Sequence, residues 1–161
     1  MYYEEVFKSL ETNNIRYLVV GGVALVLHGV VRLTGDLDLM IDLDAANIEN
    51  FLKVMAYLGY KPKLPVKAAD FAEPQKRAEW IKEKGMKVFP FIHNKDDFKL
   101  IDVFPENPLP FSEAYQRRQI ISASQMKIST ISFNDLITLK TLAGREQDKK
   151  DIEMLREFRR P

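Results

Sequence analysis

The chain has 161 residues, with 24 Lys and Arg against 23 Asp and Glu and 46% hydrophobic residues, which fits one soluble globular domain with its own core. A net charge of +1 supplies no overall field favouring nucleic acid or a membrane surface. The absence of cysteine excludes disulfides, thiolate zinc sites and cysteine nucleophiles. The sequence shows no signal peptide and no apolar stretch long enough to cross a bilayer, so we expect a cytoplasmic protein without membrane contact.

The N-terminal half is expected to alternate helices with strands. Hydrophobic periodicity predicts helices over 2–13, 23–29 and 45–58, and strands over 17–20 and 36–43. The stretch 60–75 holds three prolines, which predicts an irregular and partly mobile segment. Only a short helical turn is expected at 80–85.

The second half is expected to begin with two strands and end in helices. The pattern predicts strands over 86–92 and 98–104 joined by a hairpin, a short helix over 112–118, a small strand or hairpin over 119–131, and helices over 133–143 and 146–158 separated at Gly144. This order indicates an α/β or α+β fold, with a mixed sheet, helices mainly on one face and a C-terminal helical pair.

Two adjacent glycines stand between the first predicted strand and the next helix. A strand that turns through Gly21 and Gly22 into a helix leaves backbone N–H groups open at the helix N-terminus, where a phosphate can approach closely. The commoner meaning of an isolated Gly-Gly pair is a tight turn without a ligand. The acidic residues that follow at a fixed distance favour the phosphate loop.

Three acidic residues in strand-like segments are candidate metal ligands. Asp36 and Asp38 are two residues apart, so on a strand their carboxylates project from one face, roughly 7 Å apart along the chain. Asp102 lies alone in an apolar run, where a buried carboxylate without a partner is unfavourable. The alternatives are a wet face of an edge strand for the pair and a solvent-open edge position for Asp102. Together the three indicate a site for hard divalent cations such as Mg²⁺, and hence phosphoryl or nucleotidyl transfer.

Arg32 and Thr34 lie just before the acidic pair. Taken singly, Thr34 is explained as a turn cap and Arg32 as an ion-pair partner of Asp36 or Asp44. Beside a nucleotide, both side chains could instead reach phosphate oxygens, which the planar guanidinium of arginine fits well.

The C-terminal helical region carries a second charged group. Its members are Lys140, Arg145, Asp148 and Asp151. The simplest interpretation is that these residues are solvated charges or internal salt bridges. Asp148 and Asp151 are one turn apart and share a helix face.

Taken jointly, these motifs resemble the signature of the DNA-polymerase-β-like nucleotidyltransferase superfamily. The main likeness is the run Gly21-Gly22-Val-Ala…Gly29…Arg32-x-Thr34-x-Asp36-x-Asp38. The chain is most similar to the small bacterial and archaeal branch near the abortive-infection toxin nucleotidyltransferases, and the likeness covers about residues 15–158. Many superfamily members have Gly-Ser where this chain has Gly-Gly, so a hydroxyl contact to phosphate is lost. Gly-Gly is common in the toxin-like branch.

The resemblance implies a minimal nucleotidyltransferase domain over residues 1–161, with a core at about 15–105 and a helical part at about 111–161. It implies that Asp36, Asp38 and Asp102 are the catalytic, metal-binding residues, and that two Mg²⁺ ions bind there. It assigns nucleotide binding to the residues of the glycine turn, the loop after it and the C-terminal charged group: Gly21, Gly22, Arg32, Thr34, Lys140, Arg145, Asp148 and Asp151.

The resemblance also implies an activity. A nucleoside monophosphate moves from a nucleoside triphosphate to an acceptor hydroxyl, with release of pyrophosphate. The acceptor is RNA, such as a tRNA end, if the protein is a toxin with a cognate antitoxin, or a small molecule, as in antibiotic-modifying relatives. A non-catalytic nucleotide- or partner-binding module on the same fold is the alternative of another class. The three intact aspartates argue against that module, because a decayed site tends to lose its acids.

Overall fold

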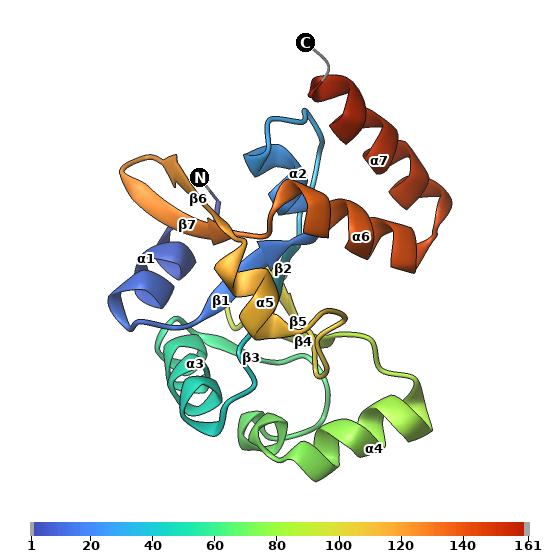
Figure 1. The fold of residues 1–161 in the computed structure, drawn as a ribbon. Helices are drawn as coiled ribbons and strands as arrows, with labels where there is room; N and C mark the ends of the chain where they lie inside the picture. The colour runs from blue at the N-terminus through green and yellow to red at the C-terminus, as the bar shows by residue number, and fades with distance from the viewer. Residues whose placement is uncertain (1, 160–161) are drawn as a thin grey trace.

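The computed structural model describes residues 2–159, which form a mixed α/β fold (Figure 1). The helices are α1 (Glu4–Thr12), α2 (Gly21–Leu27), α3 (Ala45–Tyr57), the 3-10 helix η1 (Ala68–Ala72), α4 (Pro74–Lys84), α5 (Phe111–Gln116), α6 (Phe133–Ala143) and α7 (Glu146–Phe158). The strands are β1 (Tyr17–Val20), β2 (Leu37–Ile41), β3 (Tyr60–Pro62), β4 (Phe89–His93), β5 (Leu100–Val103), β6 (Gln119–Ala123) and β7 (Met126–Thr130). Within residues 2–159, no helix combines the length and apolar character that crossing a membrane requires.

The strands form one mixed sheet in the order β3-β4-β5-β2-β1-β7-β6. β1 pairs antiparallel with β2 and parallel with β7, while β2 pairs parallel with β5. The hairpins β4–β5 and β6–β7 are antiparallel, as the sequence predicts. The central strands β1, β2 and β5 therefore bring together segments that are far apart in the chain.

One face of this sheet carries an aromatic core. Phe51 of α3 packs edge-on against Phe91 of β4 at 5.9 Å between ring centroids, and Phe71 of η1 lies 5.2 Å from Phe89. Side chains alternate along a strand, so the residues on β5 that share this face are those paired with Phe89 and Phe91. Asp102 pairs instead with Pro90 and therefore projects from the opposite face.

Some predicted boundaries differ from the structure. The predicted helix over 23–29 begins at Gly21, and the predicted strand over 36–43 is shorter, so Asp36 lies just ahead of β2. The predicted turn at 80–85 coincides with the last part of α4, an eleven-residue helix that starts with Pro74 and is capped after Lys84 by Gly85 in the left-handed conformation.

The proline-rich stretch 60–75 is more regular than predicted. It contains β3 and η1, and α4 begins within it. β3 is an edge strand paired only with β4, where Pro62 is tolerated because an edge strand needs fewer backbone donors.

The C-terminal helices α6 and α7 confirm the predicted pair. The Ser132 hydroxyl accepts from the backbone N–H of Asp135 at 3.1 Å and caps α6. Gly144 ends α6 in the left-handed conformation (φ +64°), which separates it from α7. α6 contacts both α2 and α7, so the C-terminal helices lie beside the glycine turn (Figure 1).

Candidate active site

Two of the three predicted aspartates are neighbours on adjacent strands. β2 and β5 run parallel with Asp38 opposite Asp102. The residues that flank Asp38 in sequence, Leu37 and Leu39, are fully buried in the other face of the sheet. The parallel register therefore directs both carboxylates to the same side, away from the aromatic core.

The electrostatics of the site show that the three carboxylates interact. Burial, together with the charges of Asp102 and Asp36, raises the pKa of Asp38 to about 7, even though the charges of Lys140 and Arg145 act in the opposite direction. Burial also raises the pKa of Asp102, with Asp36 adding to the effect. Such mutual repulsion stabilises a bound cation or proton at this point.

The glycine turn lies directly against Asp38. Gly21 has φ +65°, and a Cβ atom added to it would lie 2.1 Å from Asp38 Oδ2. A Cβ atom on Gly22 would lie 2.6 Å from Thr34 Oγ1. Both positions therefore require glycine for close approach, and Gly21 requires it for backbone conformation as well. No side chain caps the start of α2, and Gly21 itself lines the cleft described next.

A cleft of about 630 Å³ opens over Asp38 and Asp102. The chain that precedes β4 and the chain that follows β5 form one side, and α6 forms the other. Its charged lining residues are Asp38, Lys87, Asp102, Glu106, Lys140, Arg145 and Asp148. Asp36 lies outside this lining and borders a neighbouring, mainly apolar hollow of about 510 Å³ together with Thr34.

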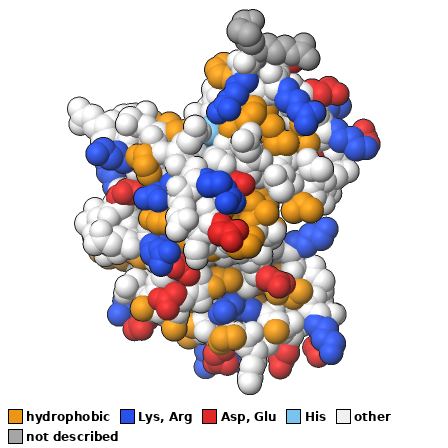
Figure 2. All heavy atoms as spheres, viewed as in Figure 1, with side chains coloured by type: hydrophobic (Ala, Val, Ile, Leu, Met, Phe, Trp, Pro, Cys, Tyr) orange, Lys and Arg blue, Asp and Glu red, His pale blue; other side chains and the backbone are white. Residues whose placement is uncertain are grey.

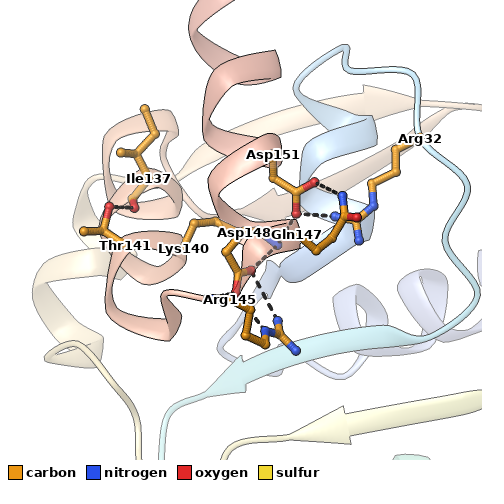
Figure 3. Close-up of polar contacts among 8 residues, drawn as sticks. All are labelled: Arg32, Ile137, Lys140, Thr141, Arg145, Gln147, Asp148 and Asp151. Atoms are coloured by element: carbon orange, nitrogen blue, oxygen red, sulfur yellow. Dashed lines mark hydrogen bonds and ion pairs between the residues drawn. The ribbon is translucent and has the colours of Figure 1, made fainter.

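The C-terminal charged residues form a connected set of ion pairs (Figure 3). Lys140 Nζ lies 2.9 Å from Asp151 Oδ2 and 3.3 Å from Asp148 Oδ1. Arg145 Nε lies 2.7 Å from Asp148 Oδ2, and Arg32 forms an ion pair with Asp151. We call these five residues the C-terminal ion network.

The ion network shows that its aspartates are paired inside the protein, and nucleotide binding by its members stays a prediction. Asp148 and Asp151 are 1% and 0% exposed and form internal salt bridges. Arg32 pairs with Asp151 rather than with Asp36 or Asp44, because the loop before β2 reaches α7.

The donor chemistry at the sheet fits a hard divalent cation. Carboxylate oxygens are the ligands that Mg²⁺ prefers, and those of Asp38 and Asp102 are adjacent and repel each other. Within residues 2–159, no three Asp, Glu, His or Cys side chains are close enough to hold a metal ion together. Asp38 and Asp102 therefore offer two carboxylates, and not three, to a cation in this arrangement.

Tyr3, Lys87 and Lys63 also lie near the site. The Tyr3 hydroxyl shares its one proton between the backbone oxygens of Gly35 and Leu100, at 2.5 and 3.0 Å, and ties the loop before β2 to β5. Lys87 lines the cleft, and the charge of Lys63 offsets part of the rise in the pKa of Asp102. Nothing in the local sequence around Tyr3 or Lys63 indicates a cleft, so neither residue is predicted from the sequence as part of the site.

The sequence matches the family described as "Nucleotidyltransferase of unknown function (DUF6036)" over residues 3–156. The chain belongs to this nucleotidyltransferase family. No protein with a curated description matches it. The match supports the predicted superfamily, and the toxin branch stays a prediction.

Several solved structures share the fold of this DUF6036 protein. The lincosamide antibiotic adenylyltransferase LnuA, bound to lincomycin, has a TM-score of 0.62 and 18% identity, with 95% of each chain covered. ANT(2")-Ia in complex with adenylyl-2"-tobramycin has a TM-score of 0.62 and 13% identity, covering 96% of this chain and 85% of that one. An antigenic nucleotidyltransferase-like protein from Paracoccidioides brasiliensis has a TM-score of 0.59 and 17% identity, covering 93% of this chain and 71% of that one. These similarities establish the nucleotidyltransferase fold.

Proposed function

We propose that this protein is a Mg²⁺-dependent nucleotidyltransferase that moves a nucleoside monophosphate from a nucleoside triphosphate to a hydroxyl group and releases pyrophosphate. The observation that carries the proposal is the register of β2 and β5, which puts Asp38 beside Asp102 where both line the cleft. Membership of a nucleotidyltransferase family supports the class of reaction.

The residues of the cleft have separate roles in the proposed reaction. The turn at Gly21 presents backbone N–H groups to the phosphates, since no side chain blocks their approach. Lys140 and Arg145 offset the negative charge of the triphosphate. Asp102, whose pKa is raised by burial, accepts the proton of the acceptor hydroxyl. The hydroxyl oxygen bonds to the α-phosphorus as the bond from that phosphorus to pyrophosphate breaks.

In this proposal the aspartates are the metal ligands. Asp38 and Asp102, with Asp36 from the neighbouring hollow, would hold Mg²⁺, as two ions, which would neutralise phosphate charge and lower the pKa of the acceptor hydroxyl. The raised pKa of Asp38 supports this assignment, because a cation would relieve the repulsion that burial intensifies.

Two kinds of acceptor are compatible with the cleft, and we put a small hydroxylated molecule first. LnuA and ANT(2")-Ia, solved with lincomycin and with adenylyl-2"-tobramycin, share this fold over 95% and 96% of this chain. On the face shown in Figure 2, basic and acidic side chains are interspersed, so that face offers no broad basic surface to an RNA backbone. An RNA end, with the protein as a toxin held by an antitoxin, is the other acceptor.

Transfer of label from nucleoside triphosphates tests the proposal. The protein is incubated with Mg²⁺, each labelled triphosphate in turn, and either lincomycin, tobramycin or total RNA, and pyrophosphate release is followed. We expect one acceptor to become labelled with equimolar release of pyrophosphate. Nucleotide binding without any release would leave only a binding module and refute the enzymatic proposal.

The Asp38→Asn variant tests the site itself. Loss of its charge should lower the transfer rate by at least about 10²–10³-fold, the range for removing an electrostatic group from a transition state, while the fold is kept. Glu49→Gln is the matched control, since it makes the same change of carboxylate to amide at an exposed position on α3, over the other face of the sheet. Wild-type turnover in Asp38→Asn would disprove the assignment of the site.

A further inference from the structure

In the C-terminal ion network, three cations share two carboxylates. All four carboxylate oxygens accept hydrogen bonds from protein groups. The donors are Arg32, Lys140, Arg145 through its backbone and side chain, and Gln147. Both carboxylates are also almost completely buried. Asp148 and Asp151 therefore offer no oxygen to a nucleotide in this arrangement.

Two of the cations do reach the cleft. Lys140 and Arg145 line it together with Asp38, and their charges act on the Asp38 carboxyl across it. Each of these side chains thus has a buried carboxylate on one side and the cleft on the other. Figure 3 shows Asp148 between the side chains of Lys140 and Arg145.

The network also joins parts of the chain that are distant in sequence. Asp151 on α7 holds Arg32 from the loop before β2 and Lys140 from α6. That loop carries Thr34 against Gly22 of the glycine turn. One carboxylate therefore fixes both a cation of the cleft and the loop beside the proposed phosphate turn.

We propose that Asp148 and Asp151 are positioning residues, of which Asp148 holds Lys140 and Arg145, and Asp151 holds Lys140 and Arg32, and that both affect nucleotide binding through these cations and not by direct contact. This inference rests on the proposed function and deepens it. It replaces direct nucleotide contact by the two aspartates, which the sequence resemblance implies. Lys and Arg side chains lose considerable rotamer freedom when fixed, so a cation already held by a carboxylate binds phosphate with a smaller entropic penalty.

Equilibrium binding of labelled triphosphates in the presence of Mg²⁺ tests the proposal without relying on turnover. In Asp148→Asn the charged bonds to Lys140 and Arg145 are lost, and we expect the Kd for nucleotide to rise about 10- to 100-fold. Glu146→Gln makes the same change two residues away at an exposed position and should leave Kd within about twofold of wild type. An unchanged Kd in Asp148→Asn would overturn the inference.

A double-mutant cycle separates positioning from a purely structural role. In a Lys140→Met/Arg145→Met background the cations are absent, so adding Asp148→Asn should not weaken nucleotide binding further. An equal loss in both backgrounds would overturn the inference, because it would mean that Asp148 acts by another route.

If Asp148→Asn alone does not fold, Lys140→Met/Asp148→Asn removes both members of a buried pair, which is better tolerated than removing one. Compared with Lys140→Met, that variant should still bind nucleotide about tenfold more weakly, because Arg145 loses its carboxylate, and equal binding would refute positioning.

The outcomes for the two proposals are distinguishable. Wild-type protein that binds triphosphate but transfers nothing refutes the enzymatic function and leaves the positioning role to be judged by Kd. Wild-type transfer together with normal binding by Asp148→Asn refutes the positioning role alone. Wild-type protein that binds no triphosphate refutes both.

Discussion

At the scale of single residues, Gly21 is the position where backbone and site chemistry depend most directly on each other. Its φ of +65° is unfavourable for residues with a side chain, and a Cβ atom would overlap Asp38 Oδ2 at 2.1 Å. We predict that Gly21→Ala lowers the free energy of unfolding by about 1–3 kcal/mol and abolishes transfer, because the Asp38 carboxylate must move. Chemical denaturation and the label-transfer assay measure the two effects.

Gly85 provides the matched control for that substitution. It has nearly the same φ, +61°, at the end of α4, but a Cβ atom there would meet nothing within 4 Å. Gly85→Ala should therefore show the backbone strain alone, about 1–2 kcal/mol, with normal transfer. Equal loss of transfer in both variants would contradict the idea that Gly21 is required by its contact with Asp38.

At the scale of elements, α6 matters because it brings Lys140 to the cleft. Its start depends on Ser132, whose hydroxyl accepts from the backbone N–H of Asp135 at 3.1 Å. We predict that Ser132→Ala lowers the free energy of unfolding by about 1 kcal/mol, since an N-terminal backbone donor of the helix loses its acceptor. Urea titration measures this as a lower midpoint with an unchanged m-value.

Thr138, on the exposed side of the same helix, is the control for this prediction. Its hydroxyl donates to the carbonyl of Asn134 four residues earlier, where that carbonyl already belongs to the helix. Thr138→Ala should change stability by no more than about 0.5 kcal/mol. A loss as large as that of Ser132→Ala would indicate a general sensitivity of α6 instead of a capping contribution.

The sequence predicts elements with a strong local signal and misses those that depend on distant partners. β1, α6 and α7 are confirmed because periodicity and the glycine at 144 mark them locally. The sequence predicts too short a helix at α4, because the polar composition of α4 hides its single inward face. It does not predict the edge strand β3, because the prolines there indicate an irregular chain. Both elements are stabilised by tertiary packing that no local pattern records.

The same division applies to the candidate site. Alternation along each strand correctly predicts that Asp38 and Asp102 project from the face opposite to that of their apolar sequence neighbours. Only the parallel pairing of β2 with β5 makes the two aspartates adjacent. The contact of Arg32 with Asp151 joins residues 119 positions apart and has no local signature. For this reason the sequence alone leaves several partners open for Arg32.

At the scale of the whole molecule, the site makes folding stability depend on pH. The pKa of Asp38 is about 7 in the folded protein against an ordinary value of 3.8. Between these values the folded state keeps a proton that the unfolded state has released, so the free energy of unfolding falls as pH rises. The contribution of the Asp38 proton to the free energy of unfolding is complete below about pH 4 and is lost by about pH 7, and its magnitude is up to about 4 kcal/mol. The raised pKa of Asp102 acts in the same direction.

Denaturant unfolding at pH 5 and pH 8 without divalent ions measures this dependence, and Asp38→Asn isolates it because other titrating groups are common to both proteins. We expect wild type to lose more stability than the variant between the two pH values. Mg²⁺ added at pH 8 should restore stability to wild type and less to Asp38→Asn, because the cation binds the ionised carboxylates of the folded state. The same pH-dependent loss in both proteins, with no response to Mg²⁺, would show that the repulsion between Asp38 and Asp102 contributes nothing to folding and that this pair is not the metal site.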